Sequence, residues 1–299
     1  MKENRKHRKK ITALLVLMLM LTTVIGSADF AEAGTYKGTW WLKVNTQCNV
    51  VTAYKRVDGE WEPVRAMLCS TGLNDTTPQG GFFLKGRWNW GALYEGVYGQ
   101  YCTHITGDIL FHSVFYNEQY KKNSMPIEEY NKLGEPASHG CVRLTVMDAK
   151  WVYENCPKGT KVTIYSSSKP GPLGKPERIP VITKRETTWD PTDPDPKNPN
   201  FKLKPPVITI SEEKETEIPY GSKYSLTSGV AAQDPNTFMN LDELITVSKV
   251  KKWSADEQRY IADTFSTKKP GTYKVTYTVN DPYSGRSSRT IKVKVMKKV

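Results

Sequence analysis

The residues best suited to covalent chemistry lie in one short segment, residues 138–144, which read SHGCVRL. Cys141 in this segment is a candidate nucleophile, because a thiolate attacks carbonyl carbon readily. His112 lies upstream at the end of an apolar run and is a candidate base for the thiol proton. The backbone carbonyl of Ser113 is a candidate acceptor that fixes the histidine tautomer. A buried cysteine and a structural histidine are the alternative that residue types alone leave open.

The backbone around Cys141 is suited to hold a negative charge. Residues 145–148, TVMD, have the form of a capping box, which predicts that a helix begins just after the segment. We expect the helix N-terminus to lower the pKa of Cys141 and to favour its thiolate. The amides of Gly140 and Cys141 could bind an oxyanion, and a glycine permits the sharp turn that this requires. The segment therefore predicts a site for acyl transfer.

Strands are needed to position these residues. Alternating apolar residues over 41–54 and 61–70 predict a hairpin with Asp58-Gly59 as its turn. Short helices are expected over 127–133 and over 149–156, where apolar residues recur at helical spacing, and a strand is expected over 161–165. We therefore predict a mainly β fold, with a β-rich catalytic domain and short helices over residues 34–165.

A proline-rich segment divides the chain. Residues 166–206 hold ten of the nineteen prolines, which predicts an extended, semi-rigid linker. Residues 207–299 alternate clearly at 207–210, 271–279 and 289–295, and they contain neither cysteine nor histidine. This pattern predicts a C-terminal immunoglobulin-like β-sandwich that acts as a binding module or spacer.

The first 33 residues predict secretion. Six basic residues between positions 2 and 10 precede the apolar run 11–25, and Ala31-Glu32-Ala33 offers a signal-peptide cleavage site. This run is shorter than the roughly 20 residues that span a bilayer, although an uncleaved anchor is the alternative. We expect a secreted, cell-wall-associated or extracellular protein with no stable membrane span after signal removal.

Five cysteines in a secreted chain predict disulfides and one free thiol. If the hairpin turn sets the register, Cys48 lies opposite Cys69 at a non-hydrogen-bonded pair, within disulfide reach. Pro63 is the weak point of this pairing, because it could introduce a bulge that shifts the register. Cys102 and Cys156 are the second expected pair, by elimination, if the candidate nucleophile stays free.

Residues 138–144 resemble the signature of the L,D-transpeptidases with a YkuD-type catalytic domain, bacterial enzymes that crosslink peptidoglycan. The family pattern places a histidine well upstream of Ser/Thr-His-Gly-Cys, followed by an apolar residue and then Arg or Asn. Residues 77–80, which read TPQG, and the segments 148–149 and 159–162 also resemble parts of the family. The resemblance covers about residues 41–165.

The resemblance implies a role for each matching residue. Cys141 is the nucleophile, and His112 is the general base that Ser113 orients. His139 and Gly140 form the oxyanion turn together with the nucleophile. The residues that the resemblance assigns to substrate binding are Ser138 and Arg143.

The reaction of the family begins when the thiolate attacks the carbonyl of the third stem residue and releases the terminal D-alanine. A side-chain amine of another stem then takes the acyl group and gives a 3→3 crosslink. Water as the acceptor gives L,D-carboxypeptidase activity instead. The resemblance implies peptidoglycan stem peptides as partners and carbapenem-type β-lactams as inhibitors, and it implies no metal and no cofactor.

Several alternatives accompany this reading. A non-catalytic wall adhesin is one alternative for the chain, and a structural salt bridge is the alternative role for Arg143. A sortase-like enzyme would carry Thr-Leu-x-Thr-Cys, and papain-like hydrolases place the cysteine before the histidine, so both fit less well. The stretch between His112 and Ser138 is longer than in many members, and residues 117–130 within it are expected to form a lid or substrate-binding cap.

The net charge of +12 is spread thinly along the chain. No basic block or aromatic-basic stripe is visible in the sequence, which excludes nucleic acid as a main partner. The C-terminal part resembles bacterial immunoglobulin-like domains, since Gly271-Thr272-Tyr273 and Asn280-Asp281 are typical of their last hairpin. We expect this part to contact wall glycan or an anionic wall polymer, or to act as a spacer.

Overall fold

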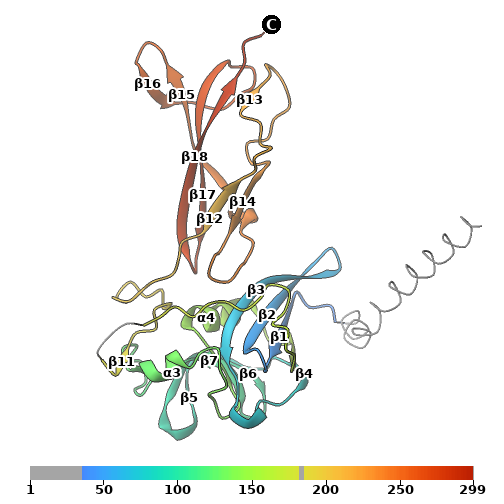
Figure 1. Ribbon diagram of the computed structural model, residues 1–299, viewed down its shortest axis with the longest axis vertical. Coiled ribbons are helices and arrows are strands. Elements are labelled where there is room, and N and C mark those ends of the chain that lie inside the picture. The colour runs from blue at the N-terminus through green and yellow to red at the C-terminus, as the bar shows by residue number, and fades with distance from the viewer. Residues whose placement is uncertain (1–35, 182–184, 299) are drawn as a thin grey trace, which may run out of the picture. The chain divides into compact units, whose positions relative to one another are not determined.

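The computed structural model of the chain describes residues 36–181 and 185–298. The chain divides into one unit of residues 1–39 and one of residues 40–299. The predicted signal peptide, residues 1–33, lies outside the described residues. Strands dominate the larger unit and the helices are few and short, so the prediction of a mainly β fold is confirmed (Figure 1). Within the described ranges, no helix is both long enough and apolar enough to cross a membrane.

A nine-stranded mixed sheet forms the first part of the larger unit. Its strand order is β4-β10-β1-β2-β3-β9-β7-β6-β5. β7 and β9 are parallel neighbours in this order, so the segment that ends in His112 lies beside the segment that follows Cys141. The strands are β1 (Trp40–Asn45), β2 (Val50–Val57), β3 (Glu60–Ser70), β4 (Gly80–Phe83), β5 (Arg87–Ala92), β6 (Tyr98–Thr106), β7 (Ile109–Ser113), β9 (Val142–Leu144) and β10 (Lys161–Tyr165).

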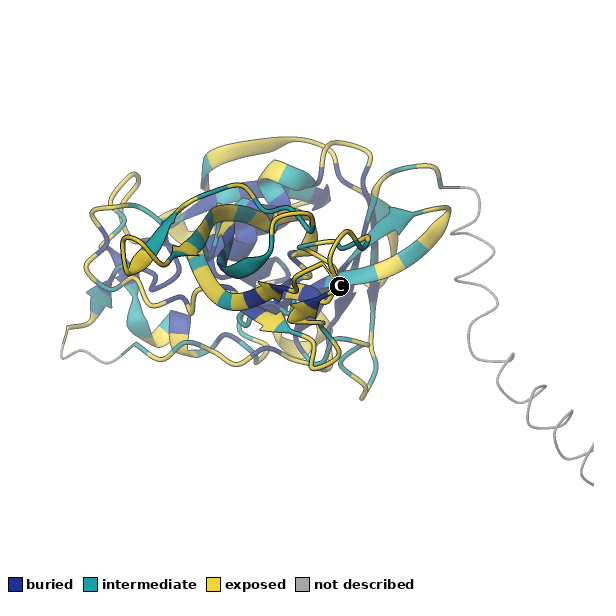
Figure 2. Ribbon diagram, turned by 90° about the horizontal axis from the view of Figure 1, so that it is seen from above, coloured by how far each residue is buried: buried dark blue, intermediate teal, exposed yellow. Residues whose placement is uncertain are grey.

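Helix α4 (Val146–Asn155) follows β9 and packs on the sheet through its apolar face. Trp151 and Val152 of this helix are buried in the main core, which explains the helical spacing of apolar residues in the sequence. Figure 2 colours the buried stretches of the chain dark blue and the exposed stretches yellow. Thr145 caps the helix, because its Oγ1 accepts a hydrogen bond of 3.2 Å from the amide of Asp148. Helix α3 (Ile127–Asn131) is shorter than the predicted 127–133.

The hairpin of β2 and β3 has the predicted turn but not the predicted register throughout. Asp58 and Gly59 both have positive φ, as a two-residue hairpin turn requires. The pairing follows the expected register from the turn to Pro63, but the next paired residues are Ala53 and Arg65. One residue of β3 is therefore extra, and the strand bulges directly after the proline.

This bulge overturns the predicted disulfide between Cys48 and Cys69. Beyond the bulge the register is shifted by one residue, and the amide of Cys69 donates to the carbonyl of Asn49 instead. A shift of one residue turns side chains to opposite faces of a sheet, so Cys69 is buried in the core while the Cys48 thiol lies 3.2 Å from the carbonyl of Ser167. Both thiols are free.

The second predicted disulfide, between Cys102 and Cys156, is also wrong. Both cysteines are free and fully buried, and each behaves as a small apolar core residue. Burial raises the pKa of the Cys102 thiol to about 12, which keeps it protonated.

The proline-rich segment is not the free spacer that its composition predicts. Its Asp190 is fully buried and accepts a hydrogen bond of 3.0 Å from the amide of Val146 at the start of α4. The Nζ of Lys122 lies 3.0 Å from the carboxylates of both Asp193 and Asp195. β11 (Thr187–Thr188) also pairs with β8 (Met125–Pro126). Because of these contacts, the segment is an ordered part of the fold.

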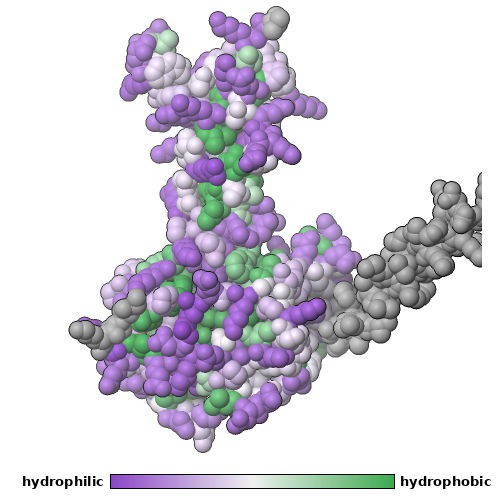
Figure 3. All heavy atoms as spheres, viewed as in Figure 1, coloured by the Kyte–Doolittle hydropathy of each residue, from purple (hydrophilic) through white to green (hydrophobic). Residues whose placement is uncertain are grey.

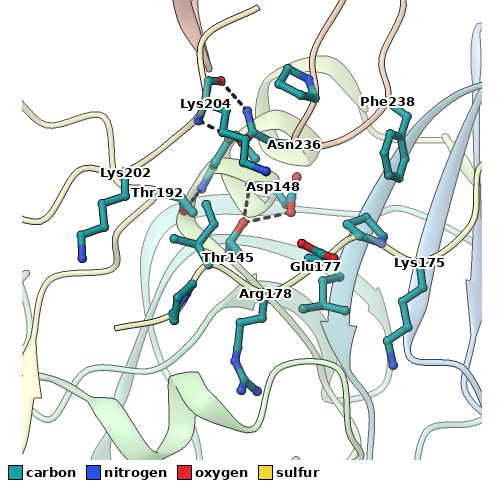
Figure 4. A pocket seen from close by; sticks show the side chains of 16 residues that line it. Thr145, Asp148, Lys175, Glu177, Arg178, Thr192, Lys202, Lys204, Asn236 and Phe238 are labelled. Carbon is teal, nitrogen blue, oxygen red and sulfur yellow. Dashed lines mark hydrogen bonds between the residues drawn. The ribbon is translucent and has the colours of Figure 1, made fainter. Parts of the chain in front are cut away.

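A cavity of about 580 Å³ lies beside this segment (Figure 4). Thr145 and Asp148 of the catalytic part line it together with residues 175–180 of the proline-rich segment. A further part of its wall comes from Pro235, Asn236 and Phe238, and Asn236 exchanges two hydrogen bonds with the backbone of Lys204.

A buried arginine links β3 to α4. Arg65 is fully buried, and its Nη2 lies 2.8 Å from the Oδ1 of Asp148. Its Nη1 lies 4.0 Å from the carboxylate of Asp234, and its guanidinium lies over the ring of Trp151 at 5.2 Å. The bulge after Pro63 places this arginine, because it turns the residues that follow toward the interior.

Residues 207–295, called the C-terminal β region below, form two further sheets. One pairs β12 (Val207–Ile210) with β14 (Val230–Gln233). The other has the order β13-β18-β17-β15-β16, and its inner face buries alternate residues such as Tyr273, Val275 and Tyr277. The immunoglobulin-like assignment stays a prediction. The five strands of the larger sheet are β13 (Glu217–Ile218), β15 (Thr246–Ser254), β16 (Arg259–Ala262), β17 (Gly271–Asp281) and β18 (Gly285–Val295).

Candidate active site

The turn before Cys141 is held by the side chain of Ser138. The Ser138 Oγ donates to the carbonyl of Cys141 at 2.6 Å and accepts from the amide of Gly140 at 3.0 Å. The Gly140 amide therefore already forms a hydrogen bond within the turn. The sequence predicted two oxyanion donors, the amides of Gly140 and Cys141, and only the Cys141 amide remains as a candidate donor. Ser138 is buried and serves this turn, although it also lines the cavity in front of the thiol.

Only glycine fits at position 140. Its φ is 139°, and a Cβ there would lie 2.7 Å from the Cδ1 of Ile109 and 3.2 Å from the carbonyl oxygen of Thr76. Thr77 secures the same turn, because its Oγ1 donates to the carbonyl of Gly140 at 2.8 Å and accepts from the amide of Gly72 at 2.7 Å. The TPQG segment of the sequence therefore supports the turn that carries Cys141.

β7 holds His112 in one tautomer. The Nδ1 of His112 lies 2.6 Å from the carbonyl oxygen of Ser113, which can only accept, so Nδ1 carries the proton and Nε2 is free to take one. This is the carbonyl that the sequence offered as a candidate. A Cβ on Gly99 would lie 3.1 Å from the Nδ1 of the imidazole, so the absence of a side chain at this position leaves room for the ring. The parallel pairing sets His112 opposite Arg143 and thus diagonal to Cys141.

The protonation states of Cys141 and His112 differ from the activated thiolate that the sequence predicts. Burial raises the pKa of the Cys141 thiol, and a hydrogen bond from the Leu110 amide and the charge of Arg143 oppose this only in part. The prediction of a lowered pKa is wrong because β9 separates the cysteine from α4, which begins at Val146. Burial, with help from Arg143, lowers the pKa of His112 to about 4. At neutral pH the site therefore holds a thiol and a neutral imidazole, the protonation states that a general base needs.

Arg143 is paired within the protein. Its Nη1 lies 2.6 Å from the Oε2 of Glu129 on α3, and its guanidinium lies over the ring of Phe115 at 5.0 Å. The side chain is largely buried yet lines the cavity in front of Cys141. It therefore ties α3 to β9, the structural role that the sequence left open, and its charge acts on both His112 and Cys141.

A cavity of about 590 Å³ lies in front of the thiol. His112, Ser138, His139 and Cys141 all line it, so the structure brings together the predicted base, nucleophile and turn. The remaining residues of its wall include Trp88, Leu93, Tyr94, Glu95, Asp108 and Phe115.

The end of β5 and the loop that follows it supply part of the wall in place of the predicted lid, through residues 92–95 and Val97. Tyr94 is exposed, and its ring meets that of His139 edge-on at 5.3 Å. The predicted lid, residues 117–130, does not line the cavity, since Lys122 contacts the proline-rich segment and Glu129 contacts Arg143. The lid prediction is therefore wrong.

Sequence reasoning missed three residues at the site. Asp108 lies beside the nucleophile, since the Cys141 Sγ is 3.4 Å from its carbonyl oxygen. Gly99 leaves room for the ring of His112, and the ring of Tyr94 contacts that of His139. The Asp108 position offered a signal, because it directly precedes the apolar run that ends in His112, and Tyr94 offered one as an aromatic residue that could line a groove or belong to the core. Among the described residues, no group of three or more His, Cys, Asp or Glu side chains is arranged to hold a metal ion.

Comparisons with known proteins identify the part of the chain that carries this site. Residues 40–164 match the family model of the L,D-transpeptidase catalytic domain, YkuD. A protein of Bacillus subtilis (strain 168) named "Putative L,D-transpeptidase YciB" is 42% identical over 109 residues, which are 34% of this chain and 55% of that protein. The chain thus spans about half the length of this curated relative.

Similar solved structures cover less than half of the chain. One is a fused Zn-dependent amidase/peptidase/peptidoglycan-binding protein from Clostridium acetobutylicum ATCC 824, which is 25% identical in sequence. The similarity covers 46% of this chain and 59% of that chain, with a TM-score of 0.34. An L,D-transpeptidase from Stackebrandtia nassauensis has 18% identity, coverage of 46% and 60%, and a TM-score of 0.34. L,D-transpeptidase 3 from Mycobacterium tuberculosis, solved with a faropenem-derived adduct, has 19% identity, coverage of 43% and 60%, and a TM-score of 0.31.

The match to the family model and the identity to the Bacillus subtilis protein agree with the signature around the cysteine. Residues 40–164 of this chain are therefore similar to the L,D-transpeptidase catalytic domain of the YkuD family.

Proposed function

We propose that this chain is a secreted cysteine L,D-transpeptidase that cleaves the terminal D-alanine from peptidoglycan tetrapeptide stems and forms 3→3 crosslinks. The observation that carries the proposal is the shared cavity of Cys141 and His112, in which the imidazole is neutral and its Nε2 can accept a proton. A thiol that shares a cavity with a neutral base favours a catalytic role over a non-catalytic adhesin.

The first half of the reaction forms an acyl-enzyme. The Cys141 thiol gives its proton to the Nε2 of His112 as Sγ attacks the carbonyl carbon of the third stem residue. The Cys141 amide supports the oxyanion. The amide bond to D-alanine then breaks, His112 passes its proton to the leaving amine, and a thioester remains on Cys141.

The second half transfers the acyl group to an amine. The acceptor amine attacks the thioester carbon, its proton passes to His112, and the thiolate leaves and is reprotonated. Two exposed acidic residues, Glu95 and Asp108, line the cavity, and within the described ranges neither forms an ion pair. Their negative charge attracts a cationic acceptor, which favours an amine over water and therefore transpeptidation over L,D-carboxypeptidase activity.

The same thiol is the proposed target of carbapenem-type β-lactams. A strained lactam carbonyl that enters the cavity takes the place of the stem carbonyl, and Sγ forms a stable thioester as the ring opens. Intact-mass measurement of the protein after incubation with imipenem tests this step. An adduct on the wild type that is absent from Cys141→Ala supports the assignment, and an equal adduct on both contradicts it.

The decisive experiment follows disaccharide-tetrapeptides by mass spectrometry. The wild type is expected to convert them to a 3→3 dimer with release of D-alanine, whereas Cys141→Ala and His112→Ala are expected to lose at least about 1,000-fold in rate. Cys48→Ala, which removes a thiol outside the cavity, is the matched control and is expected to keep full activity. Tripeptide alone would assign the carboxypeptidase reaction, and unchanged tetrapeptide with a folded wild type would contradict the proposal.

A further inference from the structure

Three lysines lie directly opposite one another on the larger sheet of the C-terminal β region. Lys251 of β15 pairs with Lys274 of β17, and Lys274 pairs with Lys292 of β18. Residues that pair across neighbouring strands have side chains on the same face, and the strands are about 4.8 Å apart. The three side chains therefore form a row about 10 Å long across β15, β17 and β18, the strands drawn in orange to red (Figure 1).

This row lies on the outer face of the sheet. Tyr273 and Val275, the neighbours of Lys274 along β17, are fully buried in the core, so alternation directs Lys274 away from it. Lys251 and Lys292 are exposed. Hydrophilic side chains predominate on the visible surface around β15 and β16 (Figure 3).

The repulsion between the three lysines is offset only in part within the protein. Like charges that lie directly opposite each other destabilise a sheet. No ion pair of the described residues involves any of the three lysines. The aromatic ring of Tyr260, over which the Nζ of Lys274 lies at 4.3 Å, gives only partial compensation. A partner that carries several negative charges would relieve the repulsion.

An aromatic pair adjoins the row. Trp253, two residues beyond Lys251 on β15, pairs with Tyr260 of β16, and their rings meet edge-on at 5.2 Å. Trp253 is 41% exposed, which is unusual for so large an apolar side chain. An exposed indole face is suited to stack on the C–H groups of a sugar ring, whose positive edges meet the negative face of the aromatic system.

A ladder of hydroxyl groups continues the same face on the other side of the row. Thr276 and Thr290 are paired across β17 and β18, and their Oγ1 atoms are 2.8 Å apart. Next to them, Thr278 and Ser288 are paired with hydroxyl oxygens 2.9 Å apart. The face thus has an aromatic end, a cationic centre and an end that carries hydroxyl groups, where Lys249 of β15 also pairs with Thr276.

We propose that this lysine face, defined as Lys251, Lys274, Lys292, Trp253 and Tyr260, binds a polyanionic glycan, a linear sugar polymer with regularly spaced negative groups. The lysines meet the anionic groups, and Trp253 meets a sugar ring. This inference is independent of the proposed catalytic activity, because none of the five residues lines the cavity of Cys141. It gives a definite surface and chemistry to the wall contact that the sequence only suggests.

The binding test uses the whole protein and three defined polymers. Polygalacturonate carries a carboxylate on each sugar, dextran is an uncharged glycan, and inorganic polyphosphate carries charge without sugar. Affinity measured by biolayer interferometry is expected to be highest for polygalacturonate, lower for polyphosphate and undetectable for dextran. Binding is also expected to weaken steeply with salt, since exposed charges are screened.

Two sets of variants locate the binding surface. Lys251→Gln/Lys274→Gln/Lys292→Gln is expected to weaken binding of polygalacturonate by about 100-fold. The matched control removes three exposed lysines from other places and is expected to change binding by less than about twofold. Its substitutions are Lys85→Gln, Lys158→Gln and Lys223→Gln.

A charge reversal keeps the test valid if the triple variant is poorly folded. Lys274→Glu places a carboxylate between Lys251 and Lys292, so it is expected to stabilise the sheet while it weakens polygalacturonate binding by about tenfold or more. Trp253→Ala is expected to weaken polygalacturonate binding about fivefold and to leave polyphosphate binding unchanged.

The results that overturn the proposal are equally definite. They are the absence of polygalacturonate binding by the wild type, an equal loss in the matched control, and full binding by Lys274→Glu. Single-stranded DNA bound as tightly as polygalacturonate, or no effect of Trp253→Ala, would also overturn the assignment to a glycan. Turnover of soluble tetrapeptides is measured in parallel and is expected to be the same in all these variants.

Discussion

Positive charge is used in opposite ways in the two β-rich parts of this chain. In the catalytic part, Arg65 and Arg143 are buried, and each guanidinium lies against a carboxylate and an aromatic ring. In the C-terminal β region, Lys251, Lys274 and Lys292 share an outer sheet face, and no ion pair of the described residues involves them. A buried and paired cation fixes the structure around it, whereas an unpaired row is available to a partner.

The largest expected effect comes from breaking the buried pair of Arg65. Arg65→Met leaves the Asp148 carboxylate buried without its cation, and loss of one partner of such a pair costs about 3–5 kcal/mol. We therefore expect the free energy of unfolding, measured by urea denaturation, to fall by this amount. Arg56→Met, which removes a less buried arginine from the neighbouring strand, is the control and is expected to cost less than about 1 kcal/mol.

A second variant separates the charge from the packing. Arg65→Met/Asp148→Leu removes both charges, and we expect it to recover a substantial part of the lost stability, because the uncompensated carboxylate is gone. A loss below about 1 kcal/mol in the single variant would contradict the view that this cation is structural.

The sequence did not indicate that Arg65 would be buried. In a regular strand with the predicted register, an arginine two residues after Pro63 is most easily placed toward solvent. The bulge at this point adds one residue to β3, so Arg65 pairs with Ala53 and turns inward, and the same shift separates Cys48 from Cys69. One local irregularity therefore accounts for a missed ion pair and a wrong disulfide.

The next effect concerns a buried anion, Asp190 of the proline-rich segment. Asp190→Ala removes the acceptor for the amide of Val146 and for Thr192, and loss of such a cap costs about 1–2 kcal/mol. Burial raises the pKa of Asp190 to about 6 from an ordinary 3.8. Between these two pH values the folded state binds more protons than the unfolded state, so the contribution of Asp190 to stability grows as the pH falls.

Urea denaturation at several pH values checks this prediction. The difference in unfolding free energy between wild type and Asp190→Ala is expected to increase from pH 6 to pH 4. Asp256→Ala, in an exposed turn, is the control and should show no such increase. A difference that shrinks over this range would contradict the assignment of a raised pKa to Asp190.

The behaviour of this segment also shows where composition misleads. Its prolines predict an extended spacer, yet Asp190, Asp193 and Asn198 hold it through buried side-chain hydrogen bonds. Composition predicts the conformation of a segment that contacts nothing else. The groups that contact this segment, such as Lys122 and the amide of Val146, are distant from it in sequence. Contacts of this kind are set by the tertiary fold.

The chemistry at the site was predictable where it is local. The carbonyl of Ser113 is the immediate neighbour of His112, and the predicted hydrogen bond is present. The glycine at position 140 is required by its positive φ and by the closeness of Ile109. The pKa of Cys141 was not predictable, because it depends on how deeply the fold buries the thiol and on β9, which separates it from the helix.

A smaller effect is expected from the other buried cation. The charge of Arg143 lowers the pKa of both His112 and Cys141. Arg143→Gln is therefore expected to raise both pKa values, so alkylation of Cys141 by iodoacetamide would reach its plateau at a higher pH. The acid limb of the turnover rate would likewise move up from the range set by a His112 pKa of about 4.

Arg143→Lys distinguishes charge from geometry in this prediction. Lysine keeps the positive charge but cannot reproduce the planar contact with Glu129 and Phe115. If charge is the cause, Arg143→Lys keeps the wild-type pH profile and loses only some rate. Identical profiles for wild type and Arg143→Gln would show that the charge of Arg143 does not act on the site.

The smallest expected effect tests whether the unpaired lysines of the C-terminal β region repel one another. Opposed lysines in the row destabilise the sheet by an amount on the order of 0.5 kcal/mol, and salt screens this repulsion because the charges face solvent. Raising the salt concentration from roughly 0.02 M to roughly 0.5 M is therefore expected to stabilise the wild type relative to Lys251→Gln/Lys274→Gln/Lys292→Gln by about that amount. Thermal unfolding at both concentrations measures the difference, with Lys85→Gln/Lys158→Gln/Lys223→Gln as the control of equal charge. The control should respond to salt as the wild type does, because its lysines do not oppose one another. If the stabilities of the two triple variants respond alike to salt, the three lysines do not repel one another measurably. The contrast between buried, paired arginines and exposed, unpaired lysines would then not hold.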